Sequence, residues 1–305
     1  MKAVIRNVVV VMLFVIPVGV FAQNTRSAVS VTGSDAATCT VPDPCRTFGA
    51  ALSKTNSGGE VIVLSSGGYG PFTVSQAVTI VSPPGIYAAI APASGIGISI
   101  STASGATVVL RGLYVNGAGA PYGIYVFSAG ANIYLENMVV AGLNCSGCTA
   151  VIMPQDGNLR VTDSFFRNDF YGVSVAGTSA TVRARATIDH CRLLGTTVAV
   201  QPSNFSTVTL TNSLLTGNFR GISIDSPSAD IDAHVTVDNS VFTQNSVGIF
   251  AIRTAALVYV SSSVITQNTQ FGLDIQQGAQ VLSAGNNVLI DNAAGEAFTN
   301  TFSLK

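Results

Sequence analysis

The chain has 305 residues and a formal net charge of −1, and only 10% of its residues are charged. Proteins that bind nucleic acid need a clustered excess of lysine and arginine for phosphate contacts, so this charge balance argues against a nucleic-acid partner. The chain contains 30 glycines and no tryptophan, and about 280 residues after a leader suit one repeat-built domain, because repeats extend a core without splitting it.

The start of the chain predicts a secretory leader. Lys2 and Arg6 precede an apolar run from Val8 to Phe21, which ends in Val20-Phe21-Ala22, a cleavage site with a small residue at Ala22. A run of about 14 residues is short for a membrane span, which needs roughly 20. Residues 1–22 are therefore interpreted as a cleaved signal peptide, the alternative being an uncleaved membrane anchor. The mature protein is expected in the periplasm or outside the cell, without a membrane span.

Residues 23–59 are predicted to form a disulfide loop and a capping helix. Cys39 and Cys45 flank a short loop with two prolines, which in an oxidising compartment indicates a local disulfide rather than a redox or metal pair. Thr47–Lys54 has a short apolar stripe and an N-cap threonine, which predicts a helix. A helix at this place would cover the core and the strand edges of the first coil of a solenoid.

One sequence motif occurs three times between Ser206 and Ile275. Each copy holds three short β-branched runs that are too short for helices and are predicted to be strands. The breaks fall at residues 218–221, 245–248 and 268–272, where Asn and Gly are expected to supply the left-handed backbone of tight corners. A unit of roughly 22 to 27 residues cannot bury its apolar face alone, which predicts stacking into a solenoid.

Weaker copies of this motif extend the repeat backward. They begin near Val108, Ile133, Leu159 and Thr187, which gives at least seven coils before Ile275. The spacing favours a three-sheet parallel β-helix over leucine-rich repeats or propeller blades. The β-helix is placed at residues 60–292, with a C-terminal cap or tail at 293–305. One register forms a polar corner ladder of Asn137, Asp163, His190, Asn212 and Asn239.

Three motifs near the start of the repeats resemble a known family. They are Cys39-x5-Cys45-Arg-Thr-Phe-x-Ala-Ala-Leu, Ser57-Gly-Gly-Glu-Val and Gly67-Gly-Tyr-Gly. The chain is similar here to bacterial secreted right-handed parallel β-helix proteins of the pectin-lyase-like fold, over about Ser30 to Asn292. The resemblance implies an all-β, single-stranded right-handed parallel β-helix. It implies no particular reaction, because many members of that family have none assigned.

The remaining cysteines are assigned structural roles. Cys145 and Cys148 form a C-x-x-C motif in a Gly- and Asn-rich loop, where a loop-closing disulfide is expected. A thioredoxin-type motif would need a helix N-terminus, and a zinc site would need a second pair. Cys191 shares a register with Ser213 and Ser240, which favours an inert thiol. No metal site is predicted.

Strand alternation predicts one polar outer sheet. Ile231, Ala233, Val235 and Val237 are expected to point inward. The outward side chains fall into three columns, and Arg111 and Glu136 are expected to form an ion pair one coil apart. The columns are Asp156, Arg183, Phe205 and Asp232; Asn158, Arg185, Thr207 and His234; and Arg160, Thr187, Thr209, Thr236 and Tyr259.

This outer sheet is the predicted binding surface. Aromatic faces accept sugar rings, and arginine forks bind uronate carboxylates. In polysaccharide lyases and hydrolases of the resembled fold, the corresponding outer sheet is where substrate lies. The alternative is a solvated face whose charges prevent sideways aggregation. The predicted ligand-binding residues are Arg160, Arg183, Arg185, Phe205, Asp232, His234 and Tyr259.

Catalysis by this surface is the second hypothesis. Its candidate residues are Asp230, Asp232, His234 and Arg185. Two aspartates two apart on a strand lie roughly 6.5–7 Å apart, which a glycosidase could use. A lyase would need a base and usually calcium, so no cofactor is expected unless the protein is a lyase. The Asn-Thr-Asp, Gly-His-Gly and Arg-x-Lys motifs of pectinolytic enzymes are missing.

The first hypothesis is therefore a secreted, monomeric, non-catalytic protein that binds a polysaccharide or a cell-surface protein. The second is a polysaccharide lyase or glycoside hydrolase that acts on acidic polysaccharide, and the third is a structural spacer.

Overall fold

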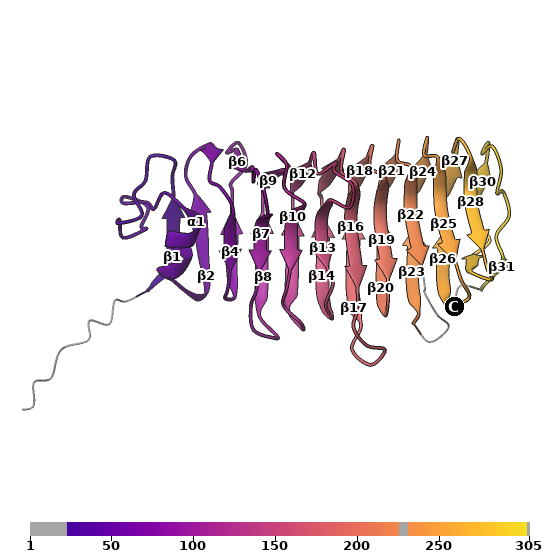
Figure 1. Ribbon diagram of the computed structural model, residues 1–305, viewed down its shortest axis with the longest axis horizontal. Helices are drawn as coiled ribbons and strands as arrows, with labels where there is room; N and C mark the ends of the chain where they lie inside the picture. The colour runs from indigo at the N-terminus through magenta and orange to yellow at the C-terminus, as the bar shows by residue number, and fades with distance from the viewer. Residues whose placement is uncertain (1–22, 226–230, 304–305) are drawn as a thin grey trace, which may run out of the picture.

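The computed structural model describes residues 23–225 and 231–303, which wind into an elongated parallel β-helix (Figure 1). The predicted signal peptide lies outside the described residues. Every strand pairing that the structure shows is parallel, and each coil adds one strand to each of three sheets. In the described part of the chain, no helix has both the length and the apolar character of a membrane span.

The first sheet, sheet A, has 12 strands within the described residues and runs the whole length of the solenoid. Its strands are β1 (Asn24–Val29), β2 (Thr55–Val63), β5 (Val78–Val81), β8 (Thr107–Arg111), β11 (Asn132–Glu136), β14 (Gly157–Thr162), β17 (Ala184–Asp189), β20 (Ser206–Thr211), β23 (Ala233–Asp238), β26 (Ala256–Ser261), β29 (Gln280–Ser283) and β31 (Asn300–Thr301).

Sheet B follows sheet A in each coil, and sheet C follows sheet B. Sheet B contains β3 (Gly67–Gly68), β6 (Ala88–Ile90), β9 (Leu113–Asn116), β12 (Val139–Ala141), β15 (Phe165–Arg167), β18 (Arg192–Leu194), β21 (Leu214–Thr216), β24 (Val241–Thr243), β27 (Val264–Thr266) and β30 (Val288–Ile290). Sheet C contains β4 (Phe72–Val74), β7 (Ile96–Ile100), β10 (Tyr122–Val126), β13 (Thr149–Met153), β16 (Tyr171–Ala176), β19 (Val198–Ser203), β22 (Arg220–Asp225), β25 (Val247–Ile252) and β28 (Phe271–Gln276).

Alternation along these strands builds the core. Val235 and Val237 of β23 are fully buried, and Val208 and Val258 stack against Val235 from the neighbouring rungs. Each rung thus buries aliphatic side chains that could not be buried by one coil alone. Ile231, which was also predicted to point inward, is half-buried beside the end of the β23 rung.

The corner between sheets A and B carries the predicted polar ladder. Asn137, Asp163, His190, Asn212 and Asn239 all adopt left-handed backbone with φ between 46° and 51°. Asn and Asp tolerate this conformation better than most residues do, because their short polar side chains bond locally. The ladder therefore marks the place where each coil turns from sheet A into sheet B.

The prediction for the second corner needs correction. Asn218, Asn245 and Asn268 do not take the left-handed backbone, which falls one residue earlier, at Gly217, Gln244 and Gln267. The three asparagines point inward instead and are buried. The side-chain amide of each donates to the side-chain oxygen of the next at 2.8–3.0 Å, ending on Asn292. These residues form an internal ladder that ties successive coils together.

The recurrence of glycine near this corner in successive repeats has a different cause from the one predicted. Gly221 and Gly248 lie outside the left-handed region. A Cβ on Gly221 would approach the carbonyl oxygen of Gly248 to 2.5 Å, and a Cβ on Gly248 would approach that of Gly272 to 2.6 Å. Close stacking of backbones, rather than φ, favours glycine at these positions.

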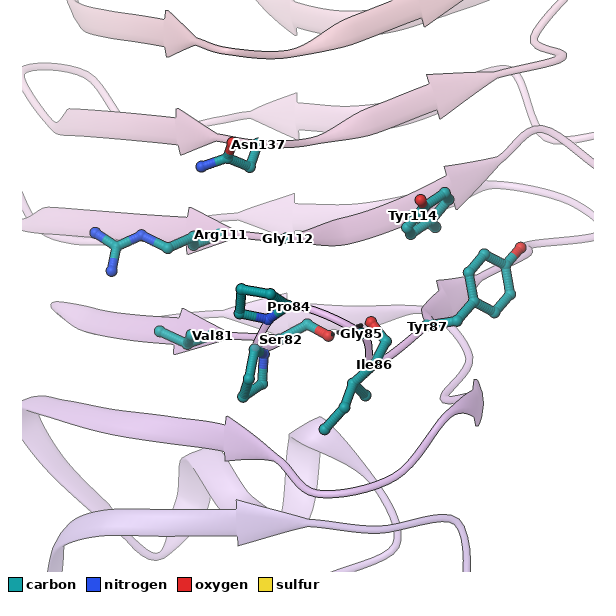
Figure 2. A pocket seen from close by; sticks show the side chains of 11 residues that line it. Val81, Ser82, Pro84, Gly85, Ile86, Tyr87, Arg111, Gly112, Tyr114 and Asn137 are labelled. Carbon is teal, nitrogen blue, oxygen red and sulfur yellow. Dashed lines mark hydrogen bonds between the residues drawn. The ribbon is translucent and has the colours of Figure 1, made fainter.

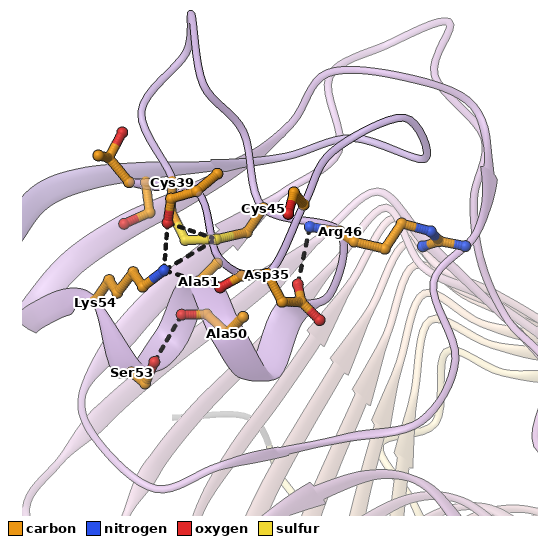
Figure 3. Close-up of a disulfide and its surroundings, with 12 residues drawn as sticks. Asp35, Cys39, Cys45, Arg46, Ala50, Ala51, Ser53 and Lys54 are labelled. Atoms are coloured by element: carbon orange, nitrogen blue, oxygen red, sulfur yellow. Dashed lines mark hydrogen bonds between the residues drawn. A yellow bond between two sulfur atoms is a disulfide. The ribbon is translucent and has the colours of Figure 1, made fainter.

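The N-terminal end is closed by a short helix, α1 (Phe48–Ser53), whose N-cap Thr47 accepts a hydrogen bond from the Ala50 amide. The buried Phe48 ring contacts Phe72 at a centroid distance of 4.5 Å. Cys39 pairs with Cys45, with Cα atoms 4.6 Å apart, and Lys54 Nζ donates to the Asp35 carbonyl beside this pair at 3.0 Å (Figure 3).

Candidate functional site

Sheet A holds two of the three predicted columns in the predicted register. Arg185 pairs with Asn158 on one side and with Thr207 on the other, and Thr207 pairs with His234. The third column also runs without a shift, from Arg160 through Thr187, Thr209 and Thr236 to Tyr259. The outer face of sheet A therefore presents polar side chains on five consecutive rungs. Arg111 and Glu136 form the predicted ion pair, with an N–O distance of 2.6 Å.

Arg183, Asp232 and His234 form a cluster that crosses two coils. Arg183 Nη1 donates to both carboxylate oxygens of Asp232 at 2.9 Å. Its Nη2 donates to the Ser206 carbonyl at 3.1 Å, and its Nε donates to Thr207 Oγ1 at 3.1 Å. His234 Nε2 lies 3.0 Å from Asp232 Oδ2. We call these three residues the Arg183 cluster.

The Arg183 cluster is electrostatically satisfied within itself. Burial tends to raise the pKa of Asp232, but hydrogen bonds from Arg183 and its charge, together with the charge of His234, lower that pKa overall. Asp232 is therefore ionised and bound at neutral pH. A carboxylate held in this way is poorly suited to donate or accept a proton during catalysis.

This geometry gives a first testable result. Replacing Asp232 with asparagine should lower the free energy of unfolding by about 1 kcal/mol at pH 7, because the half-buried Arg183 loses its counter-ion. The pKa of Asp232 is lowered in the folded state, so its contribution exists above pH ~4 and disappears as the pH falls through the folded pKa. Urea unfolding at pH 7 and at pH 3 measures the difference.

The matched control is Asp163→Asn, which removes one exposed carboxylate that is in no ion pair within the described residues. Equal effects of the two substitutions at pH 7 would contradict the role of the ion pair.

A second group of side chains lines a shallow pocket of about 240 Å³ on the same sheet. Tyr134 and Arg160 lie on paired positions of β11 and β14, and Arg185 extends from β17 beside them. Across residues 23–225 and 231–303, no carboxylate forms an ion pair with Arg160 or Arg185. Both arginines are exposed, so two guanidinium groups are available on neighbouring rungs. We call this group the arginine pocket.

The other predicted residues do not join one continuous strip. Tyr259 packs edge-on against Phe302, with ring centroids 5.3 Å apart, and Phe205 sits in a left-handed turn with φ 48°. Asp156 is buried and accepts a hydrogen bond from the Thr178 amide at 2.9 Å. Asp230 lies outside the described residues. The predicted strip is therefore divided into the arginine pocket and the Arg183 cluster.

His190 and Cys191 lie at the corner beside this face. His190 Nδ1 contacts Asp189 Oδ2 at 3.0 Å. Burial tends to raise the pKa of Asp189, but hydrogen bonds from Asn212, Thr211 and His190 lower it to about 2. The Cys191 thiol is buried, and burial raises its pKa to about 12. Such a thiol is a poor nucleophile, because the reactive species is the thiolate.

Sheet C carries a cation that sequence reasoning missed. The Arg220 guanidinium lies 3.7 Å from the centroid of Phe250 and 5.6 Å from that of Phe219. Burial lowers the pKa of Arg220, while the charge of Asp274 opposes this shift. Alternation could not have found this pair, because it places Arg220 on the same face as the buried Ile222 and Ile224, whereas Phe250 is in register with Ser223 on the opposite face.

Metal-binding side chains do not gather on these faces. Within the residues that the structure describes, no group of three or more His, Cys, Asp or Glu residues could hold a metal ion. The Cys145 and Cys148 pair is bonded, with Cα atoms 5.2 Å apart. The arginine pocket offers guanidinium, amide, hydroxyl and aromatic groups to a ligand.

Comparisons with known proteins agree on the architecture. The family model described as "Right handed beta helix region" matches residues 171–304. No curated protein matches the chain. Among solved structures, pectate lyase Pel9A is similar with a TM-score of 0.61 and 14% identity, over 93% of this chain and 80% of that one.

Two further solved structures show the same likeness. A rhamnogalacturonan lyase has a TM-score of 0.60 and 12% identity, over 81% of this chain and 75% of its own. An alginate lyase from Paenibacillus sp. str. FPU-7 has a TM-score of 0.56 and 13% identity, over 91% of this chain and 98% of its own. At such identities the likeness concerns the fold, and the chain is a right-handed parallel β-helix protein with a pectate-lyase-like solenoid.

Proposed function

We propose that this protein binds an acidic polysaccharide along the outer face of sheet A and does not cleave it. The observation that carries the proposal is the arginine pocket, where Arg160 and Arg185 face solvent on neighbouring rungs and have no carboxylate partner among the described residues. A planar guanidinium binds a carboxylate through two parallel hydrogen bonds. Neighbouring parallel strands are spaced about 4.8 Å apart, so the two groups can act on one polymer chain.

The other side chains of the arginine pocket suit a sugar ligand. Tyr134 offers an aromatic face with a polar tip, beside the exposed Asn158. Asn158 Nδ2 donates to Asn132 Oδ1 at 3.0 Å, which fixes the orientation of the amide before a ligand arrives. A preformed site spends less free energy on ordering its side chains. Three of the solved structures with this fold are lyases of pectate, rhamnogalacturonan and alginate, which supports an acidic glycan as the ligand class.

The absence of turnover is inferred from the Arg183 cluster. Two carboxylates were proposed as catalytic. Asp230 lies outside the described residues, and Asp232 is already bound by Arg183 and His234. A glycosidase needs one carboxylic acid that can be protonated and one free carboxylate. The arginine pocket itself contains no carboxylate among its lining residues. Binding without cleavage therefore fits sheet A better than hydrolysis does.

The disulfides indicate the compartment in which the protein acts. The two bonded pairs, Cys39–Cys45 and Cys145–Cys148, favour an oxidising compartment. We infer that the protein acts in the periplasm or outside the cell, as a monomer, where a polysaccharide or a glycan-bearing cell surface would be within reach.

The binding test uses hexagalacturonate and a hexameric alginate oligosaccharide as probes. We expect calorimetry to detect binding of at least one of them to the unmodified protein. The double variant Arg160→Gln/Arg185→Gln should bind about 100-fold more weakly, because each charge-assisted pair contributes roughly a tenfold factor. The affinity should also fall as salt is raised, since the pocket is exposed.

The matched control is Arg192→Gln, which removes one exposed arginine from sheet B in the same coil as Arg185. Its affinity should stay within about twofold of the unmodified protein. A loss caused by Arg192→Gln, or no loss in the double variant, would refute the assignment to sheet A. A loss caused only by Arg220→Gln would place the ligand on sheet C instead.

Turnover is tested separately with the same probes. Unsaturated products would be followed by ultraviolet absorbance, and new reducing ends by a colorimetric assay. We expect neither to accumulate. Turnover that is lost in both Asp232→Ala and His234→Ala would establish the lyase or hydrolase alternative and overturn the non-catalytic proposal.

A further inference from the structure

We propose that a separate pocket near the N-terminal end binds a neutral sugar residue. The pocket has a volume of about 620 Å³ and lies at the corner between sheets A and B, over the rungs of β5, β8 and β6. Figure 2 shows Arg111 on one side of Gly112 and Tyr114 on the other, with Pro84 between the rung that carries Arg111 and the rung that carries Val81. We call this the tyrosine pocket.

An insertion builds the wall of the tyrosine pocket. Six residues, Ser82–Tyr87, separate β5 from β6, whereas Gly112 alone separates β8 from β9 at the same corner of the next coil. One coil later, two residues, Asn137 and Met138, connect β11 to β12 at the same corner. The extra length is therefore not needed to turn the chain. It places Pro83, Pro84 and Ile86 beside an otherwise open corner.

The inserted loop is held rigidly. The Ser82 amide donates to the Arg111 carbonyl at 2.9 Å, and Ser82 Oγ donates to the Ile86 carbonyl at 2.9 Å. The Tyr87 amide donates to Ser66 Oγ at 3.0 Å. These bonds fix both ends of the loop to neighbouring coils. The pocket is thus formed before a ligand binds, which lowers the entropic cost of binding.

Two tyrosines offer their ring faces at the pocket. Tyr87 is 46% exposed and Tyr114 is 36% exposed, and their centroids lie 4.5 Å apart at an angle of 55°. Exposed aromatic rings on a rigid wall are costly to leave in water and accept the apolar C–H face of a pyranose. Within the described residues, neither phenol hydroxyl has a hydrogen-bond partner, so both can bond sugar hydroxyls.

The charge of the tyrosine pocket favours a neutral ligand. Glu136 Oε2 binds Arg111 at its Nε, 2.7 Å away, and at its Nη2, 2.6 Å away. The pair leaves no uncompensated charge to attract a uronate, unlike the arginine pocket. Asn137 is exposed, and its side-chain amide lacks a partner in the part of the chain that the structure describes. It can therefore donate to a hydroxyl group of a sugar ring.

The experiment uses four neutral probes: cellohexaose, xylohexaose, mannohexaose and β-1,4-galactohexaose. Titration calorimetry should detect binding of at least one of them to the full chain. Tyr114→Ala and Tyr87→Ala should each weaken that binding about tenfold, since a stacked ring contributes about this factor. Tyr114→Phe keeps the ring and should stay within about threefold.

The matched control is Tyr122→Ala, which removes a partly buried tyrosine from sheet C. Failure of all four probes to bind, or an equal loss in Tyr122→Ala, would overturn the proposal. This result is independent of the acidic-glycan test, because Arg160→Gln/Arg185→Gln should bind the neutral probe normally. A variant that has lost its fold is distinguished from one that has lost only a ligand contact by its midpoint of urea unfolding. Retained binding by Tyr114→Phe makes the same distinction.

Discussion

Replacing Asp169 with asparagine should raise the free energy of unfolding by about 2–4 kcal/mol at pH 8 and by much less at pH 4. Asp169 is 2% exposed, and its Oδ2 is buried without a hydrogen-bond partner in the described structure. Its Oδ1 accepts a hydrogen bond from the Leu143 amide at 2.9 Å. Burial raises the pKa of Asp169 to about 7, although hydrogen bonds from the backbone of Leu143 and Arg167 oppose this shift.

The position of Asp169 explains why an amide should fit better than a carboxylate. Asp169 stands in the internal ladder that Asn218, Asn245 and Asn268 occupy in later coils, since its Oδ1 accepts the amide of the preceding coil as theirs do. In those coils the side-chain NH₂ group donates to a carbonyl of the preceding coil, as Asn218 Nδ2 does to Leu193 O at 3.0 Å. An asparagine at 169 supplies the same donor in place of an unpaired oxygen.

The pH dependence has a definite sign. An acid whose folded pKa is about 7, against an unfolded value of about 3.9, binds more protons in the folded state between those values. Stability therefore falls as the pH rises from about 4 to about 7 and is constant above that range. The asparagine variant lacks this dependence. Its advantage should grow across the same interval, by at most about 4 kcal/mol.

Urea unfolding of both proteins at pH 4, 6 and 8 measures this effect. Asp163→Asn, an exposed aspartate of the outer corner ladder, makes the same charge change and should show no such trend. A difference between Asp169→Asn and the unmodified protein that is equal at pH 4 and pH 8 would contradict the explanation. Destabilisation by Asp169→Asn at pH 8 would do so as well.

The architecture could be predicted from the sequence because every repeat follows the same local rules of strand alternation and strand pairing. Period-two alternation identified Val235 and Val237 as core residues, and copying the motif aligned Arg185 with Thr207 and His234. Such columns follow from backbone pairing alone, which advances by one rung per coil. Parallel pairing between β8 and β26 supplies seven sheet A rungs in this stretch of the described chain, as the repeat count predicted.

The contacts of long side chains could not be obtained in this way. Arg183 reaches across two coils to Asp232 instead of facing the arginine pocket, because an arginine has several rotatable bonds and selects the best partner in three dimensions. The direction of Asn218 also escaped prediction, since an asparagine beside a glycine, here Gly217, is typical of an exposed turn. The tyrosine pocket depends on where the 82–87 insertion folds, which repeat alignment ignores.

Removing the amide of Asn245 from the internal ladder should have a large destabilising effect. Asn245 is fully buried and takes part in four side-chain hydrogen bonds. Its Oδ1 accepts from the Asn218 amide and from Asn218 Nδ2, at 3.0 and 2.9 Å. Its Nδ2 donates to the Leu215 carbonyl and to Asn268 Oδ1, both at 3.0 Å. Asn245→Ala should therefore lower the free energy of unfolding by about 3–5 kcal/mol, because it leaves buried polar groups of two coils without hydrogen-bond partners and creates a cavity.

Asn239→Ala is the matched comparison, because it removes an asparagine from the exposed corner ladder of the same coil. It loses one hydrogen bond, from Asn239 Nδ2 to Asn212 Oδ1 at 2.7 Å, and places alanine at a φ of 46°. Its expected cost is about 1–2 kcal/mol. Urea unfolding would rank the two variants, and amide hydrogen exchange would show where the loss occurs. In a solenoid each coil contacts only its neighbours, so the lost protection in Asn245→Ala should centre on β21, β22 and β24 rather than spread evenly along the chain. A cost equal to that of Asn239→Ala would mean that stacked aliphatic side chains, and not the internal amides, hold adjacent coils together.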